Sequence, residues 1–192
     1  MSLQDVMVEE LRDLYSAENQ LLKALPKLAK AAEDEDLERA FTTHLEQTRG
    51  HVDRLKKVFE VLDEKPTGKH CKGMEGLVEE GQEAIDEDEE GSFYDIGLIG
   101  AAARVEHYEI AGYTAVIAMA SGLGLAKISQ LLEANLGEED ATRGLLEEKL
   151  EELIEQSANA SDAEEEDEDK PPSRTQSKPS TAGKVAVKKK AS

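Results

Sequence analysis

The feature that most constrains this chain is its longest apolar run, residues Ile96–Ala120, which carries charged residues near its middle. About 25 residues can span a bilayer, but Arg104, Glu106 and Glu109 would make that costly. A helix that is apolar nearly all round belongs in a protein core, where a carboxylate must be neutral, paired or bound to a metal. We therefore expect the central helix of a soluble bundle, with Glu106 and Glu109 facing inward. The alternative is a packing helix whose two acids meet Arg or Tyr partners.

The composition indicates an all-α protein with one domain. The 192 residues are rich in Leu, Ala, Glu and Lys, and no stretch alternates between apolar and polar residues as a strand does. The net charge is −20, and the residues up to Ala158 hold all of the excess, with 36 acids against 16 bases. Such an acidic body disfavours binding to nucleic acid and to anionic membranes.

Cysteine usage and the amino-terminal residues indicate a cytoplasmic protein. Cys71 is the single cysteine, so an intrachain disulfide is excluded and we expect a free surface thiol in a reducing compartment. His70 beside it could bind a metal, but two adjacent residues without further partners are better interpreted as structural. The first residues, MSLQDVMVEELRD, lack the basic start and apolar run of a secretion signal.

Two predicted helices near the amino terminus carry polar residues on their apolar faces. Residues Leu3–Ala32 have helical periodicity, and Glu18 lies at the centre of the apolar stripe, with a kink expected near Pro26. Residues Asp36–Leu62 place His44 and His51 on one flank of the stripe, two turns apart. Glu18 could instead be an edge acid that reaches solvent, and each histidine alone could be a hydrogen-bonded core residue. Glu46 points nearly the opposite way and is left out of the predicted site.

The second half of the chain repeats this pattern after a long connection. Residues Glu64–Gly73 are predicted to form a loop and Met74–Asp88 a short crossover helix. After the central helix, the Gly-rich turn SGLGLA leads into a last helix that is predicted to end near Ser157. Glu139 and Arg143 both lie in its apolar stripe. An ion pair between them, one turn apart, is the alternative to metal binding by Glu139.

Four long helices thus each place an acid or a histidine midway along a buried face. The short, long and short connections match a ferritin-like four-helix bundle, in which ligands project inward from all four helices. Clustered carboxylates are unfavourable without a cation, and carboxylates with imidazoles suit iron or manganese. The predicted metal-binding residues are Glu18, His44, His51, Glu106, Glu109 and Glu139.

Several segments resemble the bacterial YciF-type stress-protein family, above all VEHYEIAGY and HLEQT, together with LYSAENQLLKALPKLA, MEGLVEEG and LLEANLGEEDATRGLL. The resemblance covers about residues 3–155 and implies a ferritin-like fold, a dimer of helical bundles and induction under stress, with no established substrate. The Glu-x-x-His pattern of ferritin-like sites is incomplete, because Thr48 precedes His51 and Thr142 follows Glu139. Whether the site holds two metal ions, one or none stays open.

Two functional hypotheses follow for a domain over residues 1–158 and a disordered low-complexity tail over residues 159–192. The first is a cytoplasmic ferritin-like stress protein that binds iron or manganese and handles peroxide or oxygen, by analogy with other ferritin-like proteins. The second is a non-catalytic structural or interaction protein, whose metal-free polar cluster is satisfied by hydrogen bonds and by Arg143. In both cases we expect a homodimer, no membrane association, and at most weak contact with nucleic acid through the tail.

We predict that the lysine-rich end of the tail binds DNA only weakly. Its four clustered lysines follow an acidic run and hang from an acidic body that repels phosphate. Each lysine bound to a phosphate releases counterions, so binding should be lost at about 0.15 M salt. Gel shifts at this salt should show no complex for the full chain or for a chain ending at Ala158. Tight binding that disappears with the tail would contradict this prediction.

Overall fold

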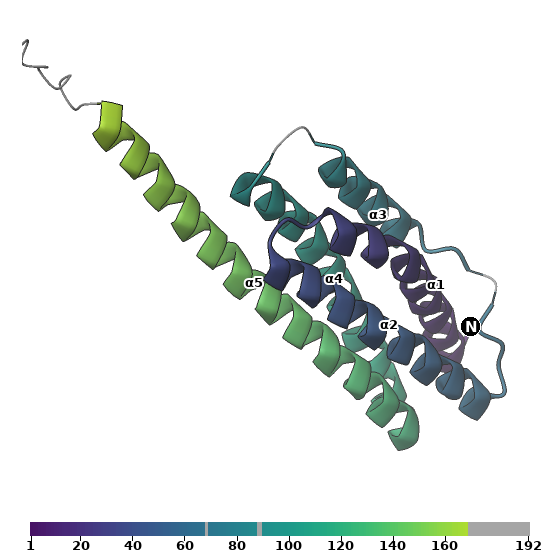
Figure 1. The fold of residues 1–192 in the computed structure, drawn as a ribbon. Coiled ribbons are helices and arrows are strands. Elements are labelled where there is room, and N and C mark those ends of the chain that lie inside the picture. Colours follow the sequence, from purple (N-terminus) through teal and green to yellow (C-terminus); the bar gives the residue numbers. More distant parts are fainter. Residues whose placement is uncertain (68, 88–89, 169–192) are drawn as a thin grey trace, which may run out of the picture.

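The structure, a computed structural model, describes residues 1–67, 69–87 and 90–168, with side chains up to residue 158. Within these ranges all the regular structure is helical, which confirms the predicted all-α class (Figure 1). The helices are α1 (Leu3–Ala31), α2 (Glu35–Leu62), α3 (Lys72–Ile85), α4 (Ser92–Gly122) and α5 (Ala126–Glu168).

The four long helices α1, α2, α4 and α5 form a bundle, and the shortest helix, α3, lies against its side (Figure 1). Short turns join α1 to α2 and α4 to α5, and these two pairs pack together through contacts of α2 with α5 and of α1 with α4. The long connection between the pairs carries α3, which packs on α1 and α4. The predicted crossover helix is therefore confirmed, and the connection order is that of a ferritin-like bundle.

Two apolar clusters fill the bundle and leave a polar layer between them. One cluster takes the second half of α1 with the first half of α2, and includes Leu25 and Phe41. The other takes the first half of α1 with the second half of α2, and includes Leu11 and Phe59. α4 and α5 divide between the clusters in the same way, so each long helix crosses the polar layer near its middle.

α5 continues beyond the end that the sequence predicted. Its apolar positions end near Leu153, but the helix runs through the acidic residues that follow, as far as Glu168. In Figure 1 this part of α5 projects past the other helices. The predicted boundary at residue 158 therefore falls inside a helix. The rest of the predicted tail, residues 169–192, lies outside the described residues.

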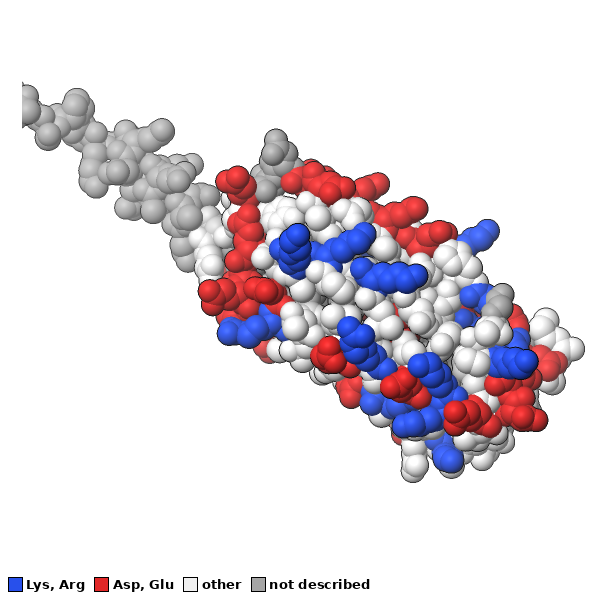
Figure 2. Space-filling view, turned by 45° about the vertical axis from the view of Figure 1, so that its right-hand side comes forward, with Lys and Arg blue, Asp and Glu red and all other residues white. Residues whose placement is uncertain are grey.

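The surface charges of the bundle are unevenly distributed. On the face shown in Figure 2, Lys and Arg side chains occupy the middle, while Asp and Glu lie mainly toward the edges. The second half of α1 contains Lys23, Lys27 and Lys30, all exposed, and has no acid between Glu18 and Glu33.

Among the described helices, none is both long and apolar enough to cross a membrane, and α4 in particular does not qualify.

Cys71 is buried, which corrects the expectation of a surface thiol. Its Sγ lies 2.9 Å from a carboxylate oxygen of Asp13 and 2.9 Å from the hydroxyl of Tyr108. The same sulfur accepts a hydrogen bond from the backbone N–H of Met74, so Cys71 caps the first turn of α3. His70 is exposed on the preceding loop. Its Nε2 lies 3.0 Å from a carboxylate oxygen of Glu75 on α3.

The turn between α1 and α2 is held by side chains from the other helix pair. The Asp95 carboxylate on α4 is 2% exposed and accepts hydrogen bonds from the backbone N–H groups of Glu33, at 3.0 Å, and Asp34, at 2.7 Å. The ammonium of Lys149 on α5 lies 2.9 Å from the Asp34 carboxylate, which also caps the start of α2. These contacts fix how the two helix pairs meet at this end of the bundle.

We predict that Asp95→Ala destabilises the fold, because it leaves two backbone N–H groups of the turn without their acceptor. The expected loss in the free energy of unfolding is about 1–3 kcal/mol. Urea unfolding followed by circular dichroism measures it. Asp53→Ala, at an exposed position on α2, should change the stability by less than about 0.5 kcal/mol. An equal, small effect of both substitutions would show that Asp95 does not hold the turn.

Candidate metal centre

All six residues predicted as metal ligands lie in the polar layer at the centre of the bundle. Each is 1% exposed or less, although their side chains come from four different helices. Their ligand atoms fall into two groups, in each of which the atoms lie within 4.8 Å of one another, and Glu139 belongs to both. The first group is His44, Glu106, Glu109 and Glu139, and the second is Glu18, His51 and Glu139.

Helical spacing explains how the four helices bring these side chains inward. On α5 the buried positions recur every three or four residues, and Glu139 is one of them. Glu106 and Glu109 are three residues apart on α4 and therefore share one face. Glu18 lies on the buried face of α1, among the buried residues that extend from Met7 to Leu28. Glu46, which was left out of the predicted site, is exposed.

Each histidine turns one ring nitrogen toward the carboxylates. Nε2 of His44 lies 3.2 Å from an oxygen of Glu106 and 3.6 Å from one of Glu139. Nδ1 of His51 lies 2.8 Å from an oxygen of Glu139 and 3.3 Å from one of Glu18. Neither nitrogen makes a hydrogen bond of good geometry despite these distances. Both are therefore oriented toward the centre of the cluster rather than toward a single partner.

Most of the cluster's inner atoms have no hydrogen-bond partner among the described residues. Burying such atoms is strongly unfavourable unless a proton or a cation satisfies them. They form a set of oxygens and imidazole nitrogens that fits the donor set of an iron or manganese site. The atoms are Oε2 of Glu18 and Glu106, both oxygens of Glu109 and Glu139, Nε2 of His44 and Nδ1 of His51.

Burial and mutual repulsion change the protonation of the cluster when no metal is bound. Burial raises the pKa of Glu106 to about 8 and the pKa of Glu109 well above its ordinary value of 4.5. Burial also raises the pKa values of Glu18 and Glu139. Burial alone would lower the pKa of His51, but the Glu139 and Glu18 carboxylates raise it to about 10. Bound protons and a charged His51 thus compensate the acids.

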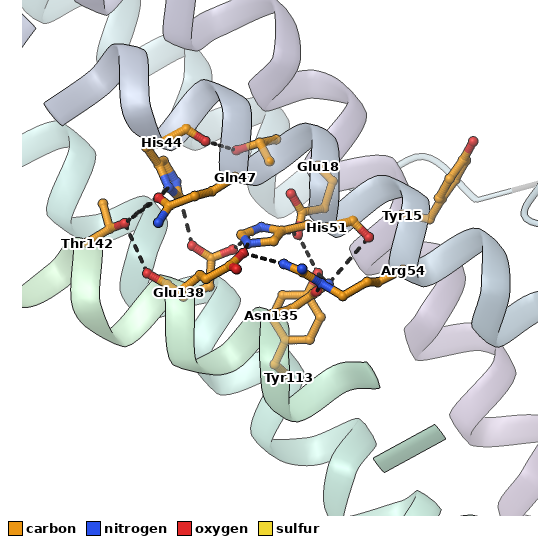
Figure 3. A network of polar contacts seen from close by, with 12 residues as sticks. Tyr15, Glu18, His44, Gln47, His51, Arg54, Tyr113, Asn135, Glu138 and Thr142 are labelled. Carbon is orange, nitrogen blue, oxygen red and sulfur yellow. Dashed lines mark hydrogen bonds and ion pairs between the residues drawn. The ribbon is translucent and has the colours of Figure 1, made fainter. Parts of the chain in front are cut away.

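Four polar residues around the second group were not predicted. Tyr113 donates a hydrogen bond to Glu18, and Asn135 donates to the Tyr113 hydroxyl at 2.8 Å (Figure 3). Arg54 contacts both Asn135 and Glu138, and Glu138 lies 2.8 Å from Nε2 of His51. Tyr113 and Asn135 are fully buried. Each is a polar residue on an apolar helix face, and this pattern in the sequence could have indicated them. Arg54 and Glu138 are partly exposed and give no such signal.

The interpretation that paired Glu139 with Arg143 is wrong. The Arg143 guanidinium turns outward to Asp140, at 2.9 Å, and to Glu147, at 2.5 Å. Thr142 takes the inward position instead, and its hydroxyl lies 3.1 Å from Nδ1 of His44. Both imidazoles of the centre therefore come from α2, and none comes from α5.

Comparisons with known proteins agree with this architecture. The family described as "Domain of unknown function (DUF892)" matches residues 2–159. Protein YciF of Escherichia coli (strain K12) is 44% identical over 142 residues, which are 73% of this chain and 86% of that protein. The crystal structure of the E. coli stress protein YciF aligns with a TM-score of 0.79 at 41% identity, covering 81% of this chain and 98% of that chain.

A more distant structure extends the likeness to ferritins. The bacterioferritin-related protein from Bacteroides fragilis, described as a dodecameric thioferritin, aligns with a TM-score of 0.60 at 14% identity, covering 85% of this chain and 92% of that chain. At this identity the match shows the fold alone, and it confirms the ferritin-like bundle. The family match and the close relationship to YciF confirm the resemblance found in the sequence: the chain belongs to the DUF892 family and is a relative of YciF.

Proposed function

We propose that the protein is a cytoplasmic stress-response protein that binds two ions of iron or manganese at the centre of its bundle. The observation that carries the proposal is that two groups of buried ligand atoms share Glu139. A carboxylate has two oxygens, so Glu139 can bridge two ions. The first ion would be held by His44, Glu106, Glu109 and Glu139, and the second by Glu18, His51 and Glu139.

The charge of the cluster supports this assignment. The four carboxylates of the two groups carry four negative charges when ionised, and the imidazoles are neutral when they act as ligands. Two divalent cations would balance these charges in a site from which the protein's apolar clusters exclude water. Carboxylate and imidazole donors together suit iron and manganese, whereas a structural zinc site is usually built from thiolates and imidazoles.

Such a centre suits peroxide or oxygen handling, because bound iron or manganese would supply the redox chemistry. YciF, the relative from E. coli, is described as a stress protein, which supports a role of this kind. The chain's own residues would hold the ligands in place: Tyr113 orients Glu18 through its hydroxyl, and Thr142 orients His44. The apolar clusters on both sides would restrict access to small molecules.

The metal-free structural alternative receives less support. It required Arg143 as an internal cation, but the Arg143 side chain lies outside the cluster.

We also propose a homodimer, as the resemblance to the YciF-type family implies. Large apolar side chains on α4 and α5 are available for such contacts, with Phe93 63% exposed, Leu145 56% and Ile154 51%.

We predict that the full chain, purified without a metal-affinity tag from cells grown with iron and manganese, contains up to two equivalents of metal. Glu109→Gln should reduce this content, because it replaces a ligand, and should leave the melting temperature of the metal-free protein unchanged or higher. Both Glu109 oxygens have no partner in the described structure, so the substitution breaks no hydrogen bond, and it replaces an acid whose ionised form is disfavoured by burial. Elemental analysis and calorimetry give the two readouts.

The exposed substitution Glu46→Gln on α2 is the control and should change neither quantity. If the wild-type protein contains no metal and its melting temperature does not respond to added Fe²⁺ or Mn²⁺, the metal function is excluded. If Glu109→Gln keeps its metal but melts earlier, the buried cluster serves the fold instead.

We predict that the metal-free protein loses stability as the pH rises from about 5 to about 8. In this window the folded state binds more protons than the unfolded chain, since the folded pKa of Glu106 is about 8 and that of His51 about 10, against ordinary values of 4.5 and 6.5. Metal displaces these protons, so the stabilisation by Mn²⁺ should grow over the same range. Calorimetry with and without Mn²⁺ measures both trends. Rising metal-free stability in this window would contradict the prediction.

A further inference from the structure

The two histidines of the centre differ in what holds their outer ring nitrogens. Nδ1 of His44 faces neutral groups, the Thr142 hydroxyl at 3.1 Å and the Gln47 side-chain oxygen at 3.4 Å. Nε2 of His51 faces a carboxylate, Glu138, at 2.8 Å. The two ligand groups, each of which contains one imidazole, are therefore supported by different chemistry.

Glu138 belongs to a closed ring of polar contacts (Figure 3). Arg54 contacts Glu138 and also donates to the side-chain oxygen of Asn135. Asn135 donates to the Tyr113 hydroxyl, which donates to Glu18. The ring closes through His51, because Nδ1 of this residue lies 3.3 Å from Glu18 and its Nε2 lies 2.8 Å from Glu138. The ring joins α1, α2, α4 and α5, and it includes Glu18 and His51, the two ligands that belong to the second group alone.

This arrangement determines which nitrogen of His51 can bind a metal. For Nδ1 to present its lone pair inward, the ring proton must be on Nε2, where Glu138 can accept it. A carboxylate in this position fixes the ring orientation and makes the imidazole a stronger ligand, and such partners commonly change metal affinity 10–100-fold. The guanidinium of Arg54 contacts the Glu138 carboxylate and so keeps it in place beside His51.

We propose that Glu138, held by Arg54, is the positioning residue for the Glu18–His51–Glu139 metal position, so that this position can be weakened while the other remains intact. The inference rests on the proposed two-ion centre. Glu138 contributes no atom to either ligand group. Its carboxylate contacts His51 directly, and the Arg54–Asn135–Tyr113 contacts connect it to Glu18, so both of its routes lead to the second group. It would therefore distinguish two ion positions that share Glu139.

Glu138 is suited to a test because its side chain is 35% exposed and that of Arg54 is 23% exposed. Substitution there leaves the apolar clusters intact. Glu138→Ala removes the acceptor for Nε2 of His51, whereas Glu138→Gln keeps an acceptor and removes the charge. Thr142→Val is the matched change on the same helix, because it removes a partner of His44 at nearly constant volume. Glu133→Gln is an exposed control on the same helix.

The experiment is a calorimetric titration of the metal-free full chain with Mn²⁺, followed by electron paramagnetic resonance. We expect two equivalents for the wild type, with a spectrum of two coupled Mn²⁺ ions. In Glu138→Ala one equivalent should weaken about 10–100-fold and the spectrum should change to that of an isolated ion, with Glu138→Gln intermediate. Thr142→Val should weaken the other equivalent, and Glu133→Gln should match the wild type.

The outcomes separate this inference from the proposed function. If the wild type binds two ions and Glu138→Ala binds them equally well, or weakens both alike, the positioning role is refuted and the two-ion centre stands. A wild type that binds neither Mn²⁺ nor Fe²⁺ refutes both proposals. Circular dichroism melting of each metal-free variant establishes that it is folded; if Glu138→Ala is unfolded, Glu138→Gln and Arg54→Gln must give the selective loss instead.

Discussion

The structure depends on placing four carboxylates and two imidazoles together in the buried centre of the bundle. Such a cluster is unfavourable in the metal-free protein, as the raised pKa values of Glu106 and Glu109 show. It persists because the apolar clusters above and below it supply the favourable free energy of folding. α4 is apolar on nearly all sides because it packs against α1, α3 and α5.

Much of this arrangement could be predicted from the sequence, because a charged residue on an apolar helical face is visible without coordinates. Glu18, Glu106 and Glu109 were identified in this way, and the structure buries all three. The supporting ring was not predicted. Arg54 and Glu138 are partly exposed, and their contacts join α2 to α5 across more than eighty residues of sequence, a pairing that periodicity along one helix does not reveal.

The two errors on α5 also have physical causes. Arg143 lies on the edge of the apolar stripe, and acids three residues before it and four residues after it pair with its long side chain at the surface. The short side chain of Thr142 takes the inward place. The end of α5 was predicted near Ser157 because the apolar residues stop there. The helix continues because Ala and Glu, which favour helices, follow, although they have no core to pack on.

The replacement of Glu-x-x-His by two histidines of α2 has a consequence for the symmetry of the centre. When each imidazole comes from a different helix pair, the two ion positions can be supported by equivalent neighbours. Here both imidazoles come from one helix, two turns apart, and must present different ring nitrogens to reach a common centre: Nε2 for His44 and Nδ1 for His51. Their outer nitrogens then meet different residues of α5, Thr142 in one case and Glu138 in the other. Unequal support for the two positions therefore follows from the helix that supplies the histidines.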